Sequence, residues 1–401
     1  VSIPLITTNR INMPEVAEKI LAEGDADMVS MARPFLADAE LVQKAAEDRS
    51  QEINTCIGCN QACLDHTFSN KLTSCLVNPR ACHETELNYV KTASPKSIAV
   101  VGAGPAGMAA ASIAAERGHK VTLFDSGEEI GGQFNIAKLI PGKEEFYETL
   151  RYYGVMLKKH HVDVRLNTRV SASDLIAGGY DDVILATGVQ PRMPDIDGIE
   201  HPSVISYLDA VKKRKPVGKR VAVIGAGGIG FDVSEFITHQ GASAALDTDE
   251  FMKEWGVDFS GQHRGGVKGV ETQLPEPARQ VYLLQRKTSK IGKNLGKTTG
   301  WIHRTSLKHR EVQMIPGVTY RKIDDQGLHI TVTAKRAEQG EDKLLPVDTI
   351  IICAGQDPLR ELQAELEAAN VSTHLIGGAD VAAELDAKRA INQGCYLAAE
   401  L

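Results

Sequence analysis

Short apolar runs alternate with amphipathic stretches along the chain, and this alternation is already clear in its first 46 residues. Each of two apolar runs predicts a short buried strand, and the 3.6-residue spacing of apolar positions that follows each run predicts a helix. The strands are expected at 2–7 and 26–31, and the helices at 14–23, capped by Asn12, and at 39–47. This alternation predicts a parallel sheet or barrel, which two units alone cannot close. Because the chain starts at Val1, on a strand and without an initiator Met, we expect a fragment of a longer protein.

Two later stretches each combine a buried strand, a glycine-rich turn and a helix. The first has strands at 96–102, 121–124 and 181–186 and a helix at 105–117, and the second runs from a strand at 220–225 to one at 348–354. Their likeness predicts a duplicated nucleotide-binding fold. Residues 247–277 are rich in Gly, Pro and charge without a period, so we expect an inserted loop. Residues 50–92 hold five of the seven cysteines and show little periodicity, so we expect a loop-rich segment held by a metal rather than by a core.

Composition excludes several classes of function. The 401 residues carry a net charge of −7, and only 5% are aromatic, which argues against binding nucleic acid or an anionic membrane surface. No apolar run is long enough to span a bilayer. Seven cysteines, four of them clustered, are too few for a disulfide scaffold at this length and favour a reducing, cytoplasmic location.

The first glycine-rich turn, GAGPAG at 102–107, predicts a flavin site. Gly102 suits the tight turn, Gly104 lets the backbone approach a pyrophosphate, and Gly107 lets the helix pack on the strand. Asp125 ends the next strand, where an acid accepts hydrogen bonds from ribose hydroxyls. The sequences GGQ at 131–133 and LATG at 185–188 are typical of flavin disulfide-reductase-like domains, so we expect FAD here rather than NAD.

The second turn, GAGGIG, places Gly225, Gly227 and Gly230 behind another buried strand and predicts a nicotinamide site. The choice of nicotinamide depends on the end of the next strand. Asp247 lies at the usual spacing and would favour NAD, but ASAAL before it has poor β-propensity. We therefore place that strand at 281–285, so that Arg286 and Lys287 face a 2′-phosphate and favour NADPH; the alternative is a solvated basic strand end.

Four cysteines, Cys56, Cys59, Cys63 and Cys75, have the spacing C-x2-C-x3-C-x11-C. Thiolates in such a loop suit either zinc or an iron–sulfur cluster. Structural zinc more often uses two C-x2-C pairs, and a redox-active cluster has a role between flavins, so we favour [4Fe–4S]. We expect the other three, Cys82, Cys353 and Cys395, to be ordinary buried thiols.

Two arginines follow the first two strands. Arg10 ends TTNR and Arg33 lies in MARPF. Arginines at the carboxyl ends of late barrel strands commonly clamp a phosphate, although an arginine can also simply cover a barrel rim.

Together these features resemble the NADPH-dependent 2,4-dienoyl-CoA reductases of bacterial type, which belong with old-yellow-enzyme-like flavoproteins and trimethylamine dehydrogenase. The resemblance covers the whole chain and is carried by TTNRIN, SMARPFLAD, CIGCNQACLD, VVGAGPAGMAAA, GGQFNIAKLIPGK, ILATGVQPR, VIGAGGIGFDVSEF and the tail IGGAD…LDAKRAINQG. It implies an α/β fold: a remnant of a (β/α)8 barrel, an iron–sulfur loop segment, and two Rossmann-like dinucleotide-binding domains of the flavin disulfide-reductase type. The implied boundaries are 1–46 for the last βα units of an FMN barrel, 47–94 for the iron–sulfur segment, 95–188 and 356–401 for the FAD domain, and 189–355 for the NADPH domain.

The resemblance also assigns individual residues. Arg10, Ala32 and Arg33 match FMN contacts on the phosphate side, and the four clustered cysteines match cluster ligands. Residues that match the family's FAD contacts are Ala106, Asp125, Gln133, Lys143 and Val170, and Gly378 and Asp380 match the segment that closes over FAD. Catalytic residues are not expected in this chain, because the family's proton-donating acid lies in the part of the barrel that is missing.

The implied activity is reduction of unsaturated acyl-CoA esters in β-oxidation, with electrons passing from NADPH through FAD and [4Fe–4S] to FMN. Two alternatives remain open at this point. One is a related enoate reductase or NADH-oxidase-like enzyme, and the other is an electron-delivery module for a separate partner protein.

Overall fold

The computed structural model describes residues 2–334, 337, 339–383 and 386–401, so Val1 and Leu385 of the tail motif lie outside it. The chain divides into two compact units. Unit 1 comprises Val1–Phe134, Glu145–Gln190 and Asp357–Leu401, and unit 2 comprises Asn135–Glu144 and Pro191–Gln356. The short strands β7 (Val189–Pro191) and β16 (Gln356–Pro358) pair where the chain passes between the units. Among the described residues, no helix is both long and apolar enough to cross a membrane.

The centre of unit 1 is a five-stranded parallel sheet in the order β17-β6-β3-β4-β5. Its strands are β3 (Ser97–Val101), β4 (Lys120–Phe124), β5 (Asp163–Arg165), β6 (Asp182–Leu185) and β17 (Thr373–Leu375). The helices of this part are α5 (Pro105–Glu116), α6 (Phe134–Ala137), α7 (Phe146–Lys159), α8 (Ala172–Ala177), α13 (Gln363–Ala368) and α14 (Ala387–Glu400). The central strands β3 and β6 consist almost entirely of buried apolar residues, as expected for a parallel sheet covered on both faces.

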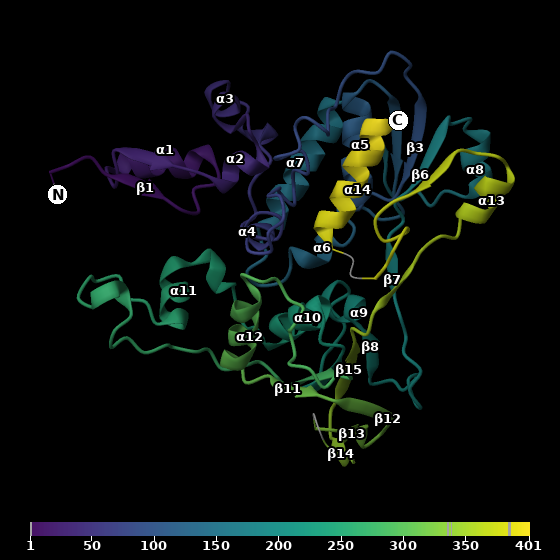
Figure 1. Ribbon diagram of the computed structural model, residues 1–401. Coiled ribbons are helices and arrows are strands. Elements are labelled where there is room, and N and C mark those ends of the chain that lie inside the picture. The colour runs from purple at the N-terminus through teal and green to yellow at the C-terminus, as the bar shows by residue number, and fades with distance from the viewer. Residues whose placement is uncertain (1, 335–336, 338, 384–385) are drawn as a thin grey trace. The chain divides into compact units, whose positions relative to one another are not determined.

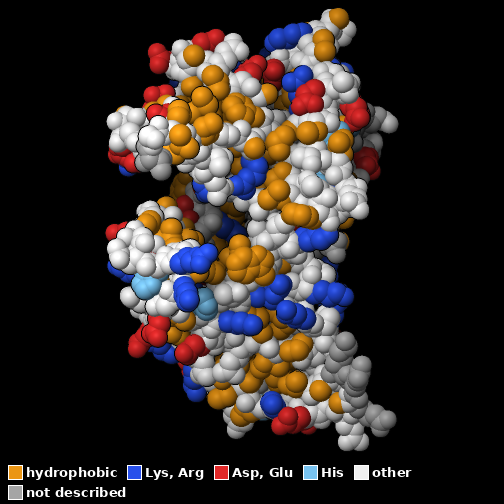
Figure 2. Space-filling model, turned by 60° about the vertical axis from the view of Figure 1, so that its left-hand side comes forward, with side chains coloured by type: hydrophobic (Ala, Val, Ile, Leu, Met, Phe, Trp, Pro, Cys, Tyr) orange, Lys and Arg blue, Asp and Glu red, His pale blue; other side chains and the backbone are white. Residues whose placement is uncertain are grey.

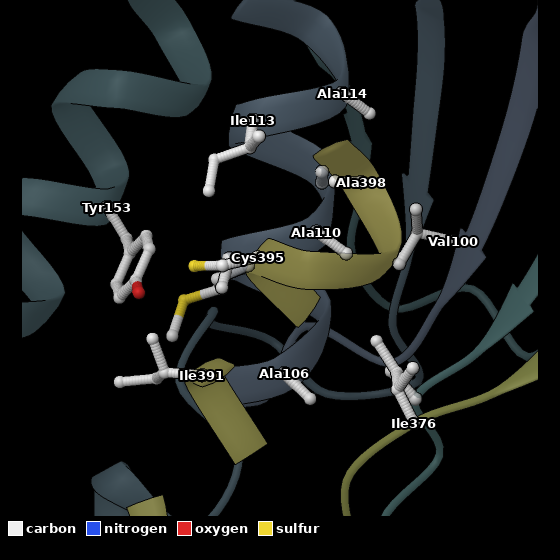
Figure 3. Close-up of a cluster of buried hydrophobic side chains, with 14 of the residues drawn as sticks. Val100, Ala106, Ala110, Ile113, Ala114, Tyr153, Ile376, Ile391, Cys395 and Ala398 are labelled. Carbon is white, nitrogen blue, oxygen red and sulfur yellow. The ribbon is translucent and has the colours of Figure 1, made fainter. Parts of the chain in front are cut away.

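The carboxyl-terminal helix α14 packs closely along α5, although the two are far apart in sequence (Figure 1). A Cβ atom added at Gly394 of α14 would lie 2.4 Å from the carbonyl oxygen of Ala106, so only glycine permits this approach. Figure 3 shows Tyr153 of α7 facing Cys395 and Ile391 of α14 in the same hydrophobic core. Cys395 is therefore the buried thiol that the sequence predicts.

The amino-terminal elements of unit 1 form a two-stranded parallel sheet with three helices. They are β1 (Ile6–Thr8), α1 (Pro14–Glu23), β2 (Met28–Ser30), α2 (Arg33–Ala37) and α3 (Leu41–Ala46). Both strands are more exposed than predicted, since Met28 is 58% and Ile6 62% exposed. Figure 2 shows hydrophobic side chains gathered on the face that unit 1 presents. The expected cap at Asn12 is wrong: Met13 is the N-cap residue, and the Asn12 amide donates to Cys56 O and Glu145 Oε1 instead.

The cysteine-bearing segment contains only short helices within the part described, a 3-10 turn (Ser50–Glu52) and α4 (Leu64–Thr67), which agrees with a loop-rich segment. It does pack against a core, however, contrary to expectation. Ile53 is fully buried, and Leu76, Val77 and Leu87 belong to the hydrophobic core of unit 1. Cys82 is exposed rather than buried, so that prediction is also wrong.

Unit 2 repeats the nucleotide-binding architecture with a parallel sheet in the order β11-β10-β9-β15-β8. Its strands are β8 (Val204–Ser206), β9 (Arg220–Ile224), β10 (Gln280–Gln285), β11 (Gln313–Pro316) and β15 (Thr349–Ile352). Its helices include α9 (Tyr207–Val211), α10 (Gly228–Thr238) and α12 (Gly300–His309). An antiparallel sheet of β12 (Val318–Asp324), β13 (Gly327–Val332) and β14 (Glu341–Leu345) follows.

The insertion between β9 and β10 is not wholly a loop. It contains α11 (Thr248–Trp255) and two short 3-10 turns (Ala244–Leu246 and Arg264–Gly266). The sequence did not predict α11, because a helix of eight residues shows too little periodicity. Asp247 caps its amino terminus, and Gly256 ends it in the left-handed conformation. The strand after the insertion is β10, which pairs with β9. The predicted placement of this strand at 281–285 is therefore confirmed.

Candidate functional site

The first glycine-rich turn connects β3 to α5, and its glycines have different surroundings. Gly102 has a φ of +107°, and a Cβ atom there would lie 2.3 Å from Ala186 O. A Cβ atom at Gly107 would lie 1.8 Å from Gly102 O, so both positions require glycine for packing. At Gly104, by contrast, the added Cβ would have no described atom within 4 Å. Packing does not explain Gly104, whereas a ligand that approaches the backbone at the start of α5 does.

Asp125 and the turn at 131–133 both contact this loop. The Asp125 carboxylate follows β4 and accepts hydrogen bonds from the N–H groups of Ala103 at 2.6 Å and Gly127 at 2.7 Å. The Gly131 N–H donates to Ala103 O at 2.7 Å, and a Cβ at Gly132 would lie 2.9 Å from the Cα of Gly104. Gln133 therefore stands in a turn that packs directly on the first glycine-rich loop.

The tail segment that contains Gly378 and Asp380 reaches the same helix terminus. A Cβ at Gly377 would lie 2.9 Å from the Cβ of Ala106, the second residue of α5. Gln393 of α14 holds the segment, because it accepts from Gly377 N–H at 2.8 Å and donates to Asp380 Oδ2 at 2.8 Å. The structure thus brings together three motifs from distant parts of the sequence: residues 102–107, 131–133 and 376–380.

Two further predicted FAD contacts, Val170 and Lys143, have other partners in the described structure. Val170 packs against the hydrophobic cluster around Phe124 and Leu175 in unit 1. Lys143 belongs to unit 2, where its Nζ forms an ion pair with Asp232 Oδ1 of α10 at 2.6 Å. Burial lowers the pKa of the nearby His303, and the positive charge of Lys143 lowers it further. Sequence reasoning missed Asp232, although the motif GAGGIGFD contains it.

The second glycine-rich turn, between β9 and α10, reproduces the first. Gly225 has a φ of +111°, with an added Cβ 2.4 Å from Cys353 O, and a Cβ at Gly230 would lie 1.8 Å from Gly225 O. An added Cβ at Gly227 would again have no described atom within 4 Å. Both units therefore present an open backbone surface at the amino terminus of a helix, which is the geometry that binds a pyrophosphate.

Arg286 and Lys287 directly follow β10, the strand beside β9. Both are exposed, and neither forms an ion pair with another described residue. The Gln285 amide shapes their turn by donating to Lys287 O and Ser289 O, each at 2.8 Å. Asp247, the alternative strand end, instead caps α11 by accepting the Glu250 N–H at 3.0 Å.

The four clustered cysteines line one cavity in unit 1. All four are free thiols, and the rest of the cavity wall is apolar or backbone, apart from Arg33 and Asn60. Burial raises the pKa of Cys56, and it raises the pKa values of Cys59 and Cys75 to about 12.

Backbone N–H groups lie near the cavity sulfurs. Those of Gly58 near Cys56, of Gln61 near Cys59, and of Val77 and Asn78 near Cys75 lower the pKa of the thiol, against the larger effect of burial. In the part of the chain that the structure describes, no three His, Cys, Asp or Glu side chains are gathered in an arrangement that could hold a metal ion. The donor set and the N–H groups nevertheless fit a sulfur-ligated cluster, whose binding would release the thiol protons.

The residues predicted to contact FMN lie beside this cavity. Arg33 is the first residue of α2, Ala32 is its N-cap, and the Arg33 guanidinium donates to Asn60 Oδ1 at 2.7 Å and to Asn9 Oδ1 at 3.2 Å. Arg10 forms an ion pair with Glu145 Oε1 at 2.5 Å. Sequence reasoning missed Asn60, although the motif CIGCNQACLD contains it, and it missed Glu145, which belongs to no recognisable ligand motif.

Comparisons with known proteins place these sites in a family. Residues 96–390 match the pyridine nucleotide-disulphide oxidoreductase family, and residues 1–52 match the NADH:flavin oxidoreductase / NADH oxidase family. The chain is 34% identical over 383 residues to a metal reductase from Desulforamulus reducens, covering 94% of this chain and 55% of that protein. It is 31% identical over 386 residues to an NADH oxidase from Thermoanaerobacter brockii, covering 94% of this chain and 53% of that protein.

A solved structure of 2-naphthoyl-CoA reductase in complex with 2-naphthoyl-CoA superposes with a TM-score of 0.84 at 27% identity, covering all of this chain and 54% of that one. The chain thus spans about half the length of the relatives that it matches. The fold is the expected one, with two Rossmann-like domains and a small remnant of a flavin-binding barrel. The chain belongs to the pyridine nucleotide-disulphide oxidoreductase family, whose members are oxidoreductases that use flavin and nicotinamide nucleotides.

Proposed function

We propose that this chain is the carboxyl-terminal part of an NADPH-dependent reductase of 2,4-dienoyl-CoA esters that acts in the β-oxidation of unsaturated fatty acids. The observation that carries the proposal is the cavity lined by Cys56, Cys59, Cys63 and Cys75, on a chain that also has two glycine-rich turns with open backbone at a helix amino terminus. When bound, FAD would accept hydride from NADPH, and a [4Fe–4S] cluster would carry single electrons onward to FMN.

Each cofactor has a proposed set of residues in this chain. We assign FAD to Gly102, Gly104 and Gly107 and to the contacting residues Ala106, Asp125, Gln133, Lys143, Val170, Gly378 and Asp380. Gly225, Gly227 and Gly230 would hold the pyrophosphate of NADPH, and Arg286 and Lys287 would hold its 2′-phosphate. Arg10, Ala32 and Arg33 would contact the phosphate side of FMN.

A [4Fe–4S] cluster is favoured over zinc by the chemistry of the cavity. Cys56, Cys59, Cys63 and Cys75 would hold such a cluster, since four cysteine thiolates are its usual ligand set, and it would supply single-electron transfer. Backbone N–H groups near several of the sulfurs would stabilise a site that becomes more negative when it gains an electron.

An acyl-CoA substrate is supported by the similarity to 2-naphthoyl-CoA reductase, which was solved with a CoA thioester bound. A relative named cinnamate reductase, 34% identical over 251 residues, supports the neighbouring possibility of a free unsaturated acid. The NADH oxidase relative supports an enzyme that uses NADH, but Arg286 and Lys287 favour NADPH. An electron-delivery module for a separate protein fits less well, because residues 1–52 match a flavin-binding oxidoreductase family.

The test uses full-length protein purified without oxygen. We expect FAD, FMN and about four iron and four sulfide ions per chain, and NADPH oxidation that depends on a 2,4-dienoyl-CoA ester. A 2-enoyl-CoA ester of the same chain length and the free dienoic acid are the matched controls. Stoichiometric zinc without sulfide would contradict the cluster, and equal rates with the free acid would favour the enoate-reductase alternative.

A further inference from the structure

Arg33 contributes the only charge among the described residues that line the cysteine cavity. The other lining residues are the four cysteines, the small or apolar side chains and Asn60. Arg33 is half-buried in this wall, so its charge is only partly solvated. The positive charge of Arg33 therefore faces the four cysteines without another charged residue in the same cavity wall.

The position of Arg33 is fixed by the cysteine loop itself. Its Nη1 donates to Asn60 Oδ1 at 2.7 Å, and Asn60 follows Cys59 directly, in the left-handed conformation with a φ of 62°. Its Nη2 donates to Asn9 Oδ1 at 3.2 Å. Both partners are neutral amides, so they orient the guanidinium without neutralising it.

Arg10, the second arginine of the barrel remnant, is held differently. Its Nη2 pairs with the Glu145 carboxylate at 2.5 Å, and Glu145 also accepts from the Asn12 amide at 3.0 Å. The Arg10 guanidinium lies against the CIGC backbone, since a Cβ at Gly58 would be 2.1 Å from its Nη1. Arg10 therefore braces the loop with its charge balanced, whereas Arg33 forms no ion pair with any described residue.

We propose that Arg33 is a charge-setting residue of the cysteine-bound cluster: its unbalanced guanidinium, aimed by Asn60, stabilises the reduced cluster. This inference rests on the proposed function. The step concerned is the gain of one electron, supplied by the reduced FAD of the same enzyme, with no bond made or broken. Reduction adds a negative charge beside the guanidinium, and nearby charge is one of the factors that set cluster potentials. Arg33 would thereby serve the cluster in addition to the predicted FMN phosphate.

The test is a redox titration of the purified full-length enzyme, with the reduced cluster followed by electron paramagnetic resonance. Arg33→Gln should lower the midpoint potential of the cluster, and Arg33→Lys, which keeps the charge, should stay close to the wild type. Arg49→Gln removes the same charge from the pair with Glu47 and Glu52, away from the cavity wall, and should leave the potential unchanged.

Several results would overturn the inference. An unchanged potential in Arg33→Gln, with only FMN content reduced, would confine Arg33 to the flavin phosphate. A fall in Arg33→Lys as large as in Arg33→Gln would show that geometry matters and charge does not. If Arg33→Gln fails to assemble a cluster, Asn60→Ala decides, because releasing the guanidinium must lower the potential. A wild-type protein without iron would instead refute the proposed function.

Discussion

The preference for NADPH should depend on two side chains, Arg286 and Lys287. The perturbation is the double substitution Arg286→Ala with Lys287→Ala. Both residues follow β10 and are exposed, so their removal should leave the fold intact. We expect weaker use of NADPH and almost unchanged use of NADH, since only NADPH carries the 2′-phosphate.

The magnitude follows from the bonds that are lost. A hydrogen bond to a charged group contributes about 1.5–3 kcal/mol, and two such bonds to one phosphate are not fully additive. Because both side chains are exposed, solvent screens part of their attraction for the phosphate. We therefore expect a loss of about 2–4 kcal/mol in kcat/KM for NADPH, which is roughly 30- to 700-fold.

The assay is stopped-flow reduction of the bound flavin by NADPH and by NADH. The charge control is Lys322→Ala with Lys343→Ala, which removes two cations of unit 2 that pair with Asp324 and Glu341 on the antiparallel sheet. This control should leave the NADPH rate constant unchanged. The site control is Asp247→Ala: if it improves NADPH use while the double variant has no effect, then Asp247 faces the ribose and the reasoning is refuted.

Further predictions concern the flavin, the cluster and acid stability. Gly104→Val should abolish FAD binding without lowering the melting temperature of the FAD-free protein, whereas Gly102→Ala should lower it, because only Gly102 has a left-handed φ and a carbonyl oxygen in the way. Cys63→Ser should lose iron and sulfide but keep FAD on analysis of the purified variant; loss of both would show that the two sites are not independent. Burial raises the pKa of Asp182, but its hydrogen bonds, with that from Ser372 foremost, lower the pKa by more than burial raises it. The net pKa of Asp182 therefore lies below the ordinary value. The ionised Asp182 carboxylate contributes to the free energy of unfolding above the unfolded-state pKa of about 3.9, and this contribution is lost as the pH falls through the folded-state pKa. Asp182→Asn should therefore lower the free energy of unfolding at pH 7 by about 1–3 kcal/mol. The variant should also lose less stability than the wild type as the pH falls.

Much of the fold could be predicted because its strongest signals are local. A buried strand, a glycine that must turn and a helix follow one another within about a dozen residues, and β3–α5 and β9–α10 appear where the sequence places them. The strand β10 was also predictable, because VYLLQ has the β-branched, aromatic and apolar residues that ASAAL lacks. Helix α11 was missed because eight residues give too few turns to establish a period.

Contacts between distant segments were not predictable from the residues alone. Nothing in the sequence around Asn12 indicates that its amide reaches Cys56 O, and its type made a helix cap the natural prediction. The expectation that Cys82 is buried failed for a similar reason, since burial of a loop residue depends on which elements pack over it. The segments that pack against the first glycine-rich turn, residues 131–133 and 376–380, could be named only through the family resemblance. For Lys143 the structure shows an ion-pair partner, Asp232, that the resemblance does not mention.

The cysteine segment shows how such distant contacts shape the site. Metal alone was expected to hold this segment, yet its backbone also forms hydrogen bonds with the barrel remnant and with α7. The buried Asp38 carboxylate of the barrel remnant accepts the Asn54 N–H at 2.9 Å and pairs with Lys44 at 2.7 Å. Arg151 of α7 donates to Ile53 O at 2.8 Å, and the Asn54 amide donates to Val77 O at 2.8 Å. These bonds order the backbone on both sides of the cavity before any cluster binds, which lowers the conformational entropy that the cluster must overcome. The barrel remnant and the cysteine segment therefore form one structural element, and this explains why residues of both, Arg33 among them, meet at the same cavity wall.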